Sequence, residues 1–259
     1  MKGKFILLGL LFAITGCSPD PAGRNDRDGK IMPVDSVVVP KTDSVQTLVR
    51  DSVSRKISSI ERQLIEMGLV NIHDMDSGIV VDLRYSTTEN FIGLDMYGDF
   101  DQCYLQKDVC EKLVLAQKFL RERYPYYSLL IFDAVRPLHI QQQMWDTLKL
   151  PPGEKIKYLS NPGNGSLHNY GAAVDLSIID EHGIPMDMGT PFDFFGEEAH
   201  PVKENELLAK GILSDRIIFN REILRNAMRQ AGFFGIQTEW WHFNSCTRAV
   251  AAEKYKIVE

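Results

Sequence analysis

The stretch SLHNYGAAVDLSII, residues 166–179, joins a loop rich in glycine and asparagine to a run of apolar and β-branched residues. This composition predicts a strand over residues 172–179, with Asp175 on the strand and His168 on its approach. The offset of seven residues is odd, so on one regular strand the two side chains would face opposite sides of the sheet. We therefore expect a turn near Gly171 that brings His168 round to face Asp175.

The stretch TEWWHF, residues 238–243, is a second place where a histidine lies near a carboxylate among apolar side chains. Its aromatic residues favour a strand, and the odd spacing of Glu239 and His242 requires a bulge or a strand end between them. A single histidine among apolar residues is more often a hydrogen-bonded core residue than a ligand. Two such histidines, each near a carboxylate that is costly to bury unpaired, favour a metal site.

Two histidines and one carboxylate are enough to hold a catalytic zinc ion with an open position. A second carboxylate beside one of the histidines can act as a base in the same site. Other divalent ions also accept this ligand set. The two stretches therefore predict a zinc hydrolase.

Outside these stretches, apolar periodicity predicts helices and strands without the regular β-α alternation of a doubly wound sheet. The expected helices are residues 55–67, 108–122, 137–148 and 218–230, and the further strands are residues 80–85 and 129–132. These elements predict an α+β fold, with one mixed domain and a central antiparallel sheet that carries the metal.

The two metal motifs, together with DAVRP at residues 133–137, resemble those of the zinc D-alanyl-D-alanine dipeptidases of the VanX type. The first motif has the form S-x-H-x-x-G-x-A-x-D and the second the form E-x-W-H. The resemblance covers roughly residues 68 to 247 in the expected order, and it includes two further segments, residues 81–93 and 188–193. It implies the fold shared by hedgehog-like and D,D-peptidase domains.

Carried over position by position, the resemblance implies that His168, Asp175 and His242 bind one Zn²⁺ per chain. It implies Glu239 as the catalytic base and Arg136 as the arginine that stabilises the tetrahedral intermediate. The chemistry of these residue types agrees, because a carboxylate can take a proton from the attacking water and deliver it to the leaving amine. A guanidinium is a fixed positive donor that does not deprotonate.

Ser166 and Asp193 match family positions that bind the amino end of the substrate. Each residue has a simpler alternative, because both follow turn-forming residues and can serve as hydrogen-bonding residues of a turn or a cap. Trp240 and Trp241 are expected to pack as pocket walls rather than to take part in the chemistry. The remaining histidines are expected to be structural or exposed: His73, His139, His182 and His200.

Residues 1–17 have the layout of a bacterial lipoprotein signal, in which two lysines precede an apolar run too short for a comfortable membrane span. The small residue before Cys17 resembles a lipobox, which predicts cleavage before Cys17 and lipidation on it. The alternative is an ordinary secreted signal in which Cys17 is incidental. Residues 18–54 are polar and contain four prolines, which predicts a flexible tether, and residues 55–259 form the predicted zinc D,D-dipeptidase domain.

The composition sets further limits. The chain of 259 residues is long enough for one domain with a substantial core, and its net charge of −6 without any lysine- or arginine-rich block argues against nucleic-acid binding. An extracytoplasmic compartment permits one disulfide, for which Cys103 and Cys110 are the nearest pair. The alternative is that these two cysteines and Cys246 are unpaired or buried thiols.

The expected function is the hydrolysis of D-Ala-D-Ala, or of a closely related D,D-dipeptide, by a lipid-anchored enzyme that faces the periplasm or the cell exterior. A role in peptidoglycan turnover fits that location. One alternative is a zinc D,D-carboxypeptidase that acts on longer wall peptides. Another is a non-catalytic wall-binding lipoprotein on the same scaffold. Glu239 and Arg136 argue against the non-catalytic alternative, because zinc binding alone requires neither residue.

Overall fold

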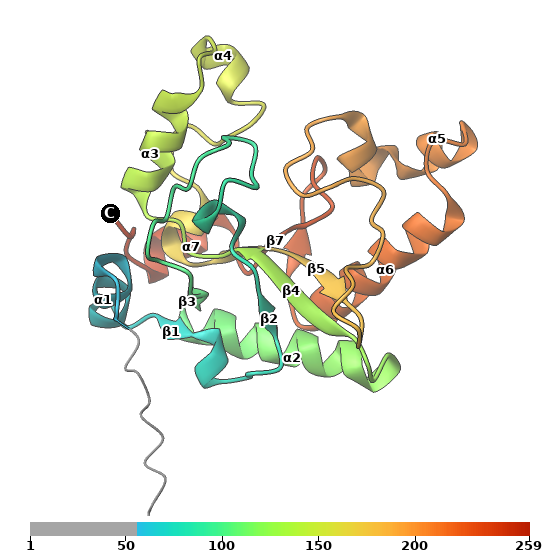
Figure 1. Cartoon of the computed structure of the whole chain (residues 1–259), viewed down its shortest axis with the longest axis horizontal. Helices are drawn as coiled ribbons and strands as arrows, with labels where there is room; N and C mark the ends of the chain where they lie inside the picture. The colour runs from blue at the N-terminus through green and yellow to red at the C-terminus, as the bar shows by residue number, and fades with distance from the viewer. Residues whose placement is uncertain (1–55) are drawn as a thin grey trace, which may run out of the picture. The chain divides into compact units, whose positions relative to one another are not determined.

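The computed structural model describes residues 56–259 (Figure 1). The predicted lipoprotein signal with Cys17 and the predicted tether of residues 18–54 lie outside this range. Within the described range, no helix is both long enough and apolar enough to cross a membrane.

Five strands form the main sheet, in the order β2-β4-β5-β7-β6 (Figure 1). β4 (Ser128–Asp133) pairs antiparallel with β5 (Ala173–Ile179), β5 pairs antiparallel with β7 (His242–Asn244), and β7 pairs antiparallel with β6 (Phe234–Gly235). β2 (Val80–Val81) is parallel to β4, so the expected antiparallel sheet is in fact mixed at this edge. A helix lies in the connection from β2 to β4, and a parallel pair requires such a crossover. The α+β prediction is confirmed.

α2 (Lys107–Arg123) and α6 (Asp215–Gln230) pack against each other, and α2 also packs on β4. The predicted boundaries of α2 are correct to within one residue at each end, because its buried side chains recur at helical spacing. α6 begins three residues earlier than expected. The side chain of Ser214 accepts a hydrogen bond from the backbone N–H of Ile217 and caps the first turn, which begins with the polar residues Asp215 and Arg216.

The remaining helices are short. They are α1 (Ser59–Glu66), α3 (Leu138–Thr147), α4 (Pro152–Lys155), α5 (Glu204–Ala209) and α7 (Arg248–Lys254). Turns of 3-10 helix lie at Ile72–Asp74, Arg84–Ser86, Leu167–Tyr170, Glu197–Ala199 and Pro201–Lys203. A separate two-stranded antiparallel sheet joins β1 (Val70–Asn71) to β3 (Tyr104–Leu105).

The strand expected over residues 80–85 is wrong in its second half, because β2 ends at Val81 and Arg84–Ser86 is a 3-10 helix. The side chain of Tyr85 is buried, and its carbonyl accepts hydrogen bonds from the backbone N–H groups of Met96 and Tyr97. Contacts with residues distant from the strand therefore override the local strand preference here.

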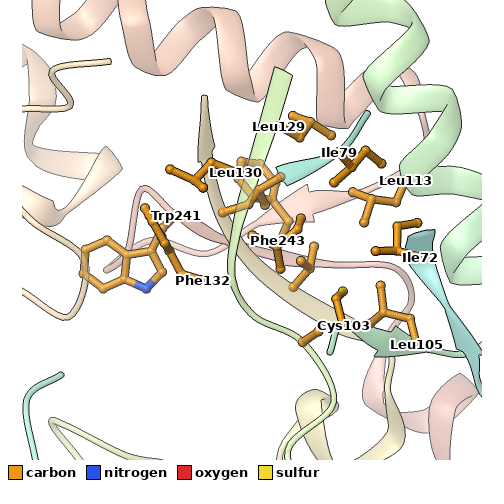
Figure 2. Packing of buried hydrophobic residues seen from close by; sticks show 14 of the residues in the cluster. Ile72, Ile79, Cys103, Leu105, Leu113, Leu129, Leu130, Phe132, Trp241 and Phe243 are labelled. Carbon is orange, nitrogen blue, oxygen red and sulfur yellow. The ribbon is translucent and has the colours of Figure 1, made fainter. Parts of the chain in front are cut away.

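β4 has a buried layer on each side. Leu129 lies toward Ile79 and Leu113 of α2, whereas Leu130 and Phe132 lie on the side of Trp241 (Figure 2). All five of these apolar side chains and Trp241 are at most 6% exposed, as expected for a strand whose successive residues alternate between two covered faces. The sheet is therefore a rigid support for the polar residues that follow Phe132.

Cys103 and Cys110 are free and buried, and Cys246 is free and partly exposed. The disulfide considered for Cys103 and Cys110 is therefore absent, and the alternative of unpaired thiols is confirmed. The thiol of Cys110 instead donates to the carbonyl of Val70 at 3.4 Å.

Candidate active site

His168 lies in the 3-10 helix that directly precedes β5. Gly171 ends this helix in the left-handed conformation, with φ 63° and ψ 31°, and the chain then turns into the strand that carries Asp175. A Cβ atom at Gly171 would come within 3.0 Å of the side chain of Leu69. The turn predicted near Gly171 is confirmed, and both its conformation and its surroundings favour glycine.

Asp175 and His242 are direct partners across the antiparallel β5–β7 pair. His242 is the first residue of β7, and Glu239 lies in the loop before the strand. The strand end expected between Glu239 and His242 is therefore present. Sheet pairing thus brings together two residues that are 67 positions apart in the sequence.

The three predicted metal ligands form one compact group, with their candidate ligand atoms all within 4.8 Å of one another. Nε2 of His168 is 3.2 Å from Nδ1 of His242. The carboxylate of Asp175 lies 2.9 Å from Nδ1 of His242 and 3.4 Å from Nε2 of His168. His168 and Asp175 are buried, and His242 is nearly so.

In each histidine, one ring nitrogen points away from the other candidate ligands and faces a carbonyl oxygen; we call it the outer nitrogen. Nδ1 of His168 is 2.7 Å from the backbone carbonyl of Ala134, and Nε2 of His242 is 2.9 Å from the amide oxygen of Asn244. Since these oxygens can only accept, each outer nitrogen carries the hydrogen and donates. In the neutral histidines the inner nitrogens then direct lone pairs toward each other and toward Asp175, an arrangement that fits a bound cation such as Zn²⁺.

The ionisation of the group is consistent with this arrangement. Burial opposes charge on Asp175, but the two histidines that face it lower its pKa below the usual value. Burial also opposes protonation of His242, but Asp175 outweighs this effect and raises the pKa of His242 to about 9. Asp175 and His242 therefore each favour the charged form of the other.

Glu239 is half-buried, and its carboxylate is 4.0 Å from Nδ1 of His242. Burial and the nearby Asp175 raise the pKa of Glu239 above its ordinary value. This carboxylate is the one beside the metal group that the sequence predicted as a base. It is close enough to act on a molecule held between itself and the histidines.

Arg136 is buried and lies 3.9 Å from the carboxylate of Asp175. Its Nε and Nη2 donate to one carboxylate oxygen of Asp133, at 3.0 and 2.5 Å. Its guanidinium also covers the ring of Tyr85 at 5.0 Å. Burial works against its charge, but Asp133 and its neighbours raise the pKa of Arg136, so it remains a cation. Its backbone N–H donates to the carbonyl of His168 at 3.0 Å.

Asp133 is a functional residue that the sequence analysis did not single out. It is fully buried at the end of β4, and besides Arg136 it accepts a hydrogen bond of 2.6 Å from the hydroxyl of Tyr97. A carboxylate directly after the apolar run of β4 and three residues before Arg136 was the available signal, since a buried acid requires a partner. Through these hydrogen bonds, Asp133 fixes the orientation of the Arg136 guanidinium.

All seven residues predicted to act in catalysis, substrate binding or metal binding line one cavity of about 310 Å³. They are Arg136, Ser166, His168, Asp175, Asp193, Glu239 and His242. Tyr85, Tyr158, Phe195, Trp241 and Arg248 are among the other lining residues. The four other histidines of the described chain do not line the cavity, and Tyr97 is buried behind it.

Ser166 directly precedes the 3-10 helix Leu167–Tyr170, and Asp193 lies in a turn, as the simpler alternatives predicted. Both residues also line the cavity. The hydroxyl of Ser166 donates to Gln141 at 3.0 Å, and its backbone N–H donates to Asn169 at 2.6 Å. Asp193 has a left-handed φ of 58°, which is unusual for a residue other than glycine, and accepts from the hydroxyl of Tyr85 at 3.0 Å. Burial, and then the charge of Asp175, raise the pKa of Asp193.

Two histidines and an aspartate in one compact group, with a further carboxylate and a fixed arginine around the same cavity, are typical of metal-dependent hydrolases that act on a carbonyl group. Residues 65–258 match the family model described as D-ala-D-ala dipeptidase, Peptidase_M15. This match spans well over half of the chain, and the chain therefore belongs to this family of peptidases.

Three similar proteins are each named D-alanyl-D-alanine dipeptidase. The chain is 32% identical over 175 residues to the protein of Escherichia coli, an alignment that covers 68% of this chain and 83% of the relative. It is 29% identical to the protein of Enterococcus faecalis and 26% identical to that of Enterococcus faecium, each over 194 residues. Both of these alignments cover 69% of this chain and 92% of the relative.

Proposed function

We propose that this protein hydrolyses D-Ala-D-Ala, or a closely related D,D-dipeptide, and that His168, Asp175 and His242 hold one Zn²⁺ for the reaction. The observation that carries this proposal is the convergence of three acceptor groups, Glu239 and Arg136 on one small cavity. A volume of about 310 Å³ is near the lower end for ligand pockets, which favours a small substrate. The similar proteins named as D-alanyl-D-alanine dipeptidases support the same substrate.

Bound zinc would supply a Lewis acid that polarises the scissile carbonyl and makes a nearby water more acidic. Glu239 takes the proton from the attacking water and passes it to the leaving amine. Arg136 donates to the oxygen of the scissile carbonyl as negative charge develops there. Asp133 keeps the guanidinium of Arg136 oriented, so this positive charge needs no rearrangement during the reaction.

Asp193 binds the amino group of the substrate in this proposal. Its carboxylate lies in the cavity without an arginine or lysine bonded to it in the described chain, and it accepts only from Tyr85 among the described hydrogen bonds. A substrate ammonium group supplies the missing positive charge and favours the ionised form of Asp193. Ser166 directs its hydroxyl hydrogen to Gln141, so its remaining lone pairs can accept from the substrate.

A D,D-carboxypeptidase that acts on longer wall peptides is the second candidate. A smaller cavity of about 200 Å³ adjoins the first and shares Ile236 and Glu239 with it. It is lined by Arg225 and Arg229, and an extended peptide could continue into it. The substrate-length comparison below separates the two activities.

The first experiment measures D-alanine release by a soluble form of the protein that lacks residues 1–17. Zinc-loaded protein is compared with chelated protein, with Glu239→Gln and with the exposed control Glu111→Gln. We expect chelation to abolish release and Glu239→Gln to lower kcat by about 10²- to 10⁴-fold, the usual contribution of a general base. Metal content measured on Glu239→Gln should remain one zinc per chain. Equal rates for Glu239→Gln and Glu111→Gln would refute the role of Glu239.

The same protein is then tested on N-acetyl-D-Ala-D-Ala. The dipeptidase proposal requires a strong preference for the free dipeptide, because Asp193 binds an unblocked amine. Preference for the acetylated peptide would favour the carboxypeptidase. Metal binding without cleavage of either substrate would favour the non-catalytic wall-binding alternative.

We further propose that the protein is a lipoprotein of the cell envelope, anchored to a membrane through Cys17 and acting in peptidoglycan turnover. This proposal rests on the sequence of residues 1–17 and of the polar segment that follows. Fractionation of cells that express the full chain or Cys17→Ser tests it. We expect the full chain in the membrane fraction and Cys17→Ser outside it, and equal partition of the two proteins would contradict the lipid anchor.

A further inference from the structure

Arg248 is a charged residue of the cavity that the proposed mechanism leaves without a role. It is the first residue of α7, it is exposed at the cavity wall, and its Nη2 donates to the carbonyl of Gly165 at 2.8 Å. Arg136, the other arginine of this cavity, is paired with Asp133. Among the described residues no carboxylate lies within ion-pair distance of Arg248, so its positive charge is not neutralised by the protein.

Arg248 has a fixed position relative to the candidate metal ligands His168 and His242. Gly165, which accepts its hydrogen bond, is three residues before His168, and Arg248 itself is six residues after His242. α7 packs on the 3-10 helix that contains His168. The guanidinium is therefore tied to both segments that supply histidines to the site.

The cavity has an acidic residue and a basic residue on different walls. Asp193 comes from the segment that leads to α5, whereas Arg248 comes from α7, and Figure 1 shows these two parts of the chain on different sides of β7. A dipeptide is a zwitterion with an ammonium group at one end and a carboxylate at the other. An unpaired acid and an unpaired guanidinium on separate walls are complementary to such a molecule.

Covalent geometry places the carboxylate of the substrate inside the same cavity. In a dipeptide the carboxylate carbon is two bonds from the scissile nitrogen, which corresponds to about 2.5 Å. When the scissile carbonyl lies beside His168, Asp175 and His242, the carboxylate must also lie within the cavity. There it requires a donor, because Asp175 and Glu239 would otherwise repel it.

We propose that Arg248 binds the C-terminal carboxylate of the substrate and so makes the enzyme selective for peptides with a free C-terminus. This inference rests on the proposed peptidase function. It identifies Arg248 as the residue that binds the carboxylate end of the substrate, whereas Asp193 binds the amino end. The bond to Gly165 occupies one N–H group and orients the guanidinium, and further N–H groups remain to donate to a carboxylate. A guanidinium suits this task because it stays charged and matches the two oxygens of a carboxylate.

The test compares D-Ala-D-Ala with D-alanyl-D-alaninamide, which lacks the terminal negative charge but has the same scissile bond. Both are assayed with the zinc-loaded soluble form of the wild type, Arg248→Ala, Arg248→Lys and the control Arg62→Ala, an exposed arginine on α1. We expect the wild type and Arg62→Ala to prefer the acid in kcat/KM by about tenfold, the factor for one charge-assisted hydrogen bond at a partly exposed site. Arg248→Ala should lose this preference, chiefly through a higher KM for the acid, and Arg248→Lys should keep part of it.

The ratio of acid to amide separates substrate binding from a structural role. If Arg248 only tethers the loop through Gly165, Arg248→Ala will slow both substrates equally and keep the wild-type ratio, which would overturn the inference. If the wild type cleaves neither D-Ala-D-Ala nor its amide but cleaves N-acetyl-D-Ala-D-Ala, the dipeptidase proposal fails while the same comparison on the acetylated acid and amide still tests Arg248. A wild type that cleaves none of these peptides would overturn both proposals.

Discussion

Replacing Asp133 by asparagine is expected to destabilise the domain strongly, although the two side chains have nearly the same size. Asp133 is fully buried and accepts two hydrogen bonds from Arg136 and one from Tyr97. Asparagine removes the negative charge and leaves the buried guanidinium opposite a neutral amide. Removal of one partner of a buried ion pair costs about 3–5 kcal/mol.

Arg136 retains a weaker attraction to Asp175 at 3.9 Å, so the lower end of that range applies. A loss of about 3 kcal/mol corresponds to a fall in Tm of roughly 6–12 °C for a domain of about 200 residues. Thermal unfolding followed by circular dichroism measures this change in chelated protein, where zinc does not contribute. Tyr97→Phe is the matched control, because it removes one hydrogen bond to Asp133 and keeps the ion pair.

The expected order of Tm is wild type, then Tyr97→Phe, then Asp133→Asn. Asp133→Asn should also lower kcat more than it raises KM, because the proposed mechanism uses Arg136 to stabilise the transition state and the substitution would displace it. A Tm for Asp133→Asn within about 2 °C of the wild type would refute the view that this buried pair is a major support of the site.

Three further predictions follow from the same geometry. Gly171→Ala should lower the free energy of unfolding by at least about 1–2 kcal/mol, measured by urea titration, because its left-handed backbone and the nearby Leu69 both disfavour a Cβ atom. Cys103 and Cys110 should not react with a thiol reagent in the folded protein between pH 7 and 10 but should react in denaturant, because burial raises both pKa values, that of Cys110 to about 12, and keeps the thiols protonated. Ser166→Ala should lower kcat/KM for D-Ala-D-Ala without changing the acid-to-amide ratio if Ser166 contacts the amino end of the substrate, and a changed ratio would instead place it at the carboxylate end.

Sequence patterns predicted the helices and strands whose burial follows from the spacing of their own apolar residues. The apolar stripe of α2 and the uninterrupted apolar run of β4 fixed these elements closely, because their burial follows directly from residue spacing. The parallel pairing of β2 could not be read in this way, since it depends on which distant strand lies beside it. The 3-10 turn at Arg84–Ser86 was likewise missed, because contacts with residues far along the chain determine it.

The residues of the candidate site were also predictable from the sequence only in part. His168, Asp175 and His242 could be found from sequence because each lies in an apolar or aromatic stretch where a polar side chain is conspicuous. Arg248 could not, because most arginines lie on the surface and the absence of an acidic partner is visible only once its surroundings are known. Asp133 was visible in the sequence, but its role depends on its contact with Arg136 inside the folded domain.

His242 lies near the end of the segment that matches the peptidase family, and it faces Asp175 only when β7 has paired with β5. The complete set of metal ligands therefore does not exist until nearly the whole domain has been synthesised and has folded. A partly folded chain offers His168 and Asp175 alone, which is a poor site for zinc. In the proposed zinc enzyme, acquisition of the metal would thus be a late event in maturation, and zinc content would measure the fraction of molecules in which β7 has paired with β5.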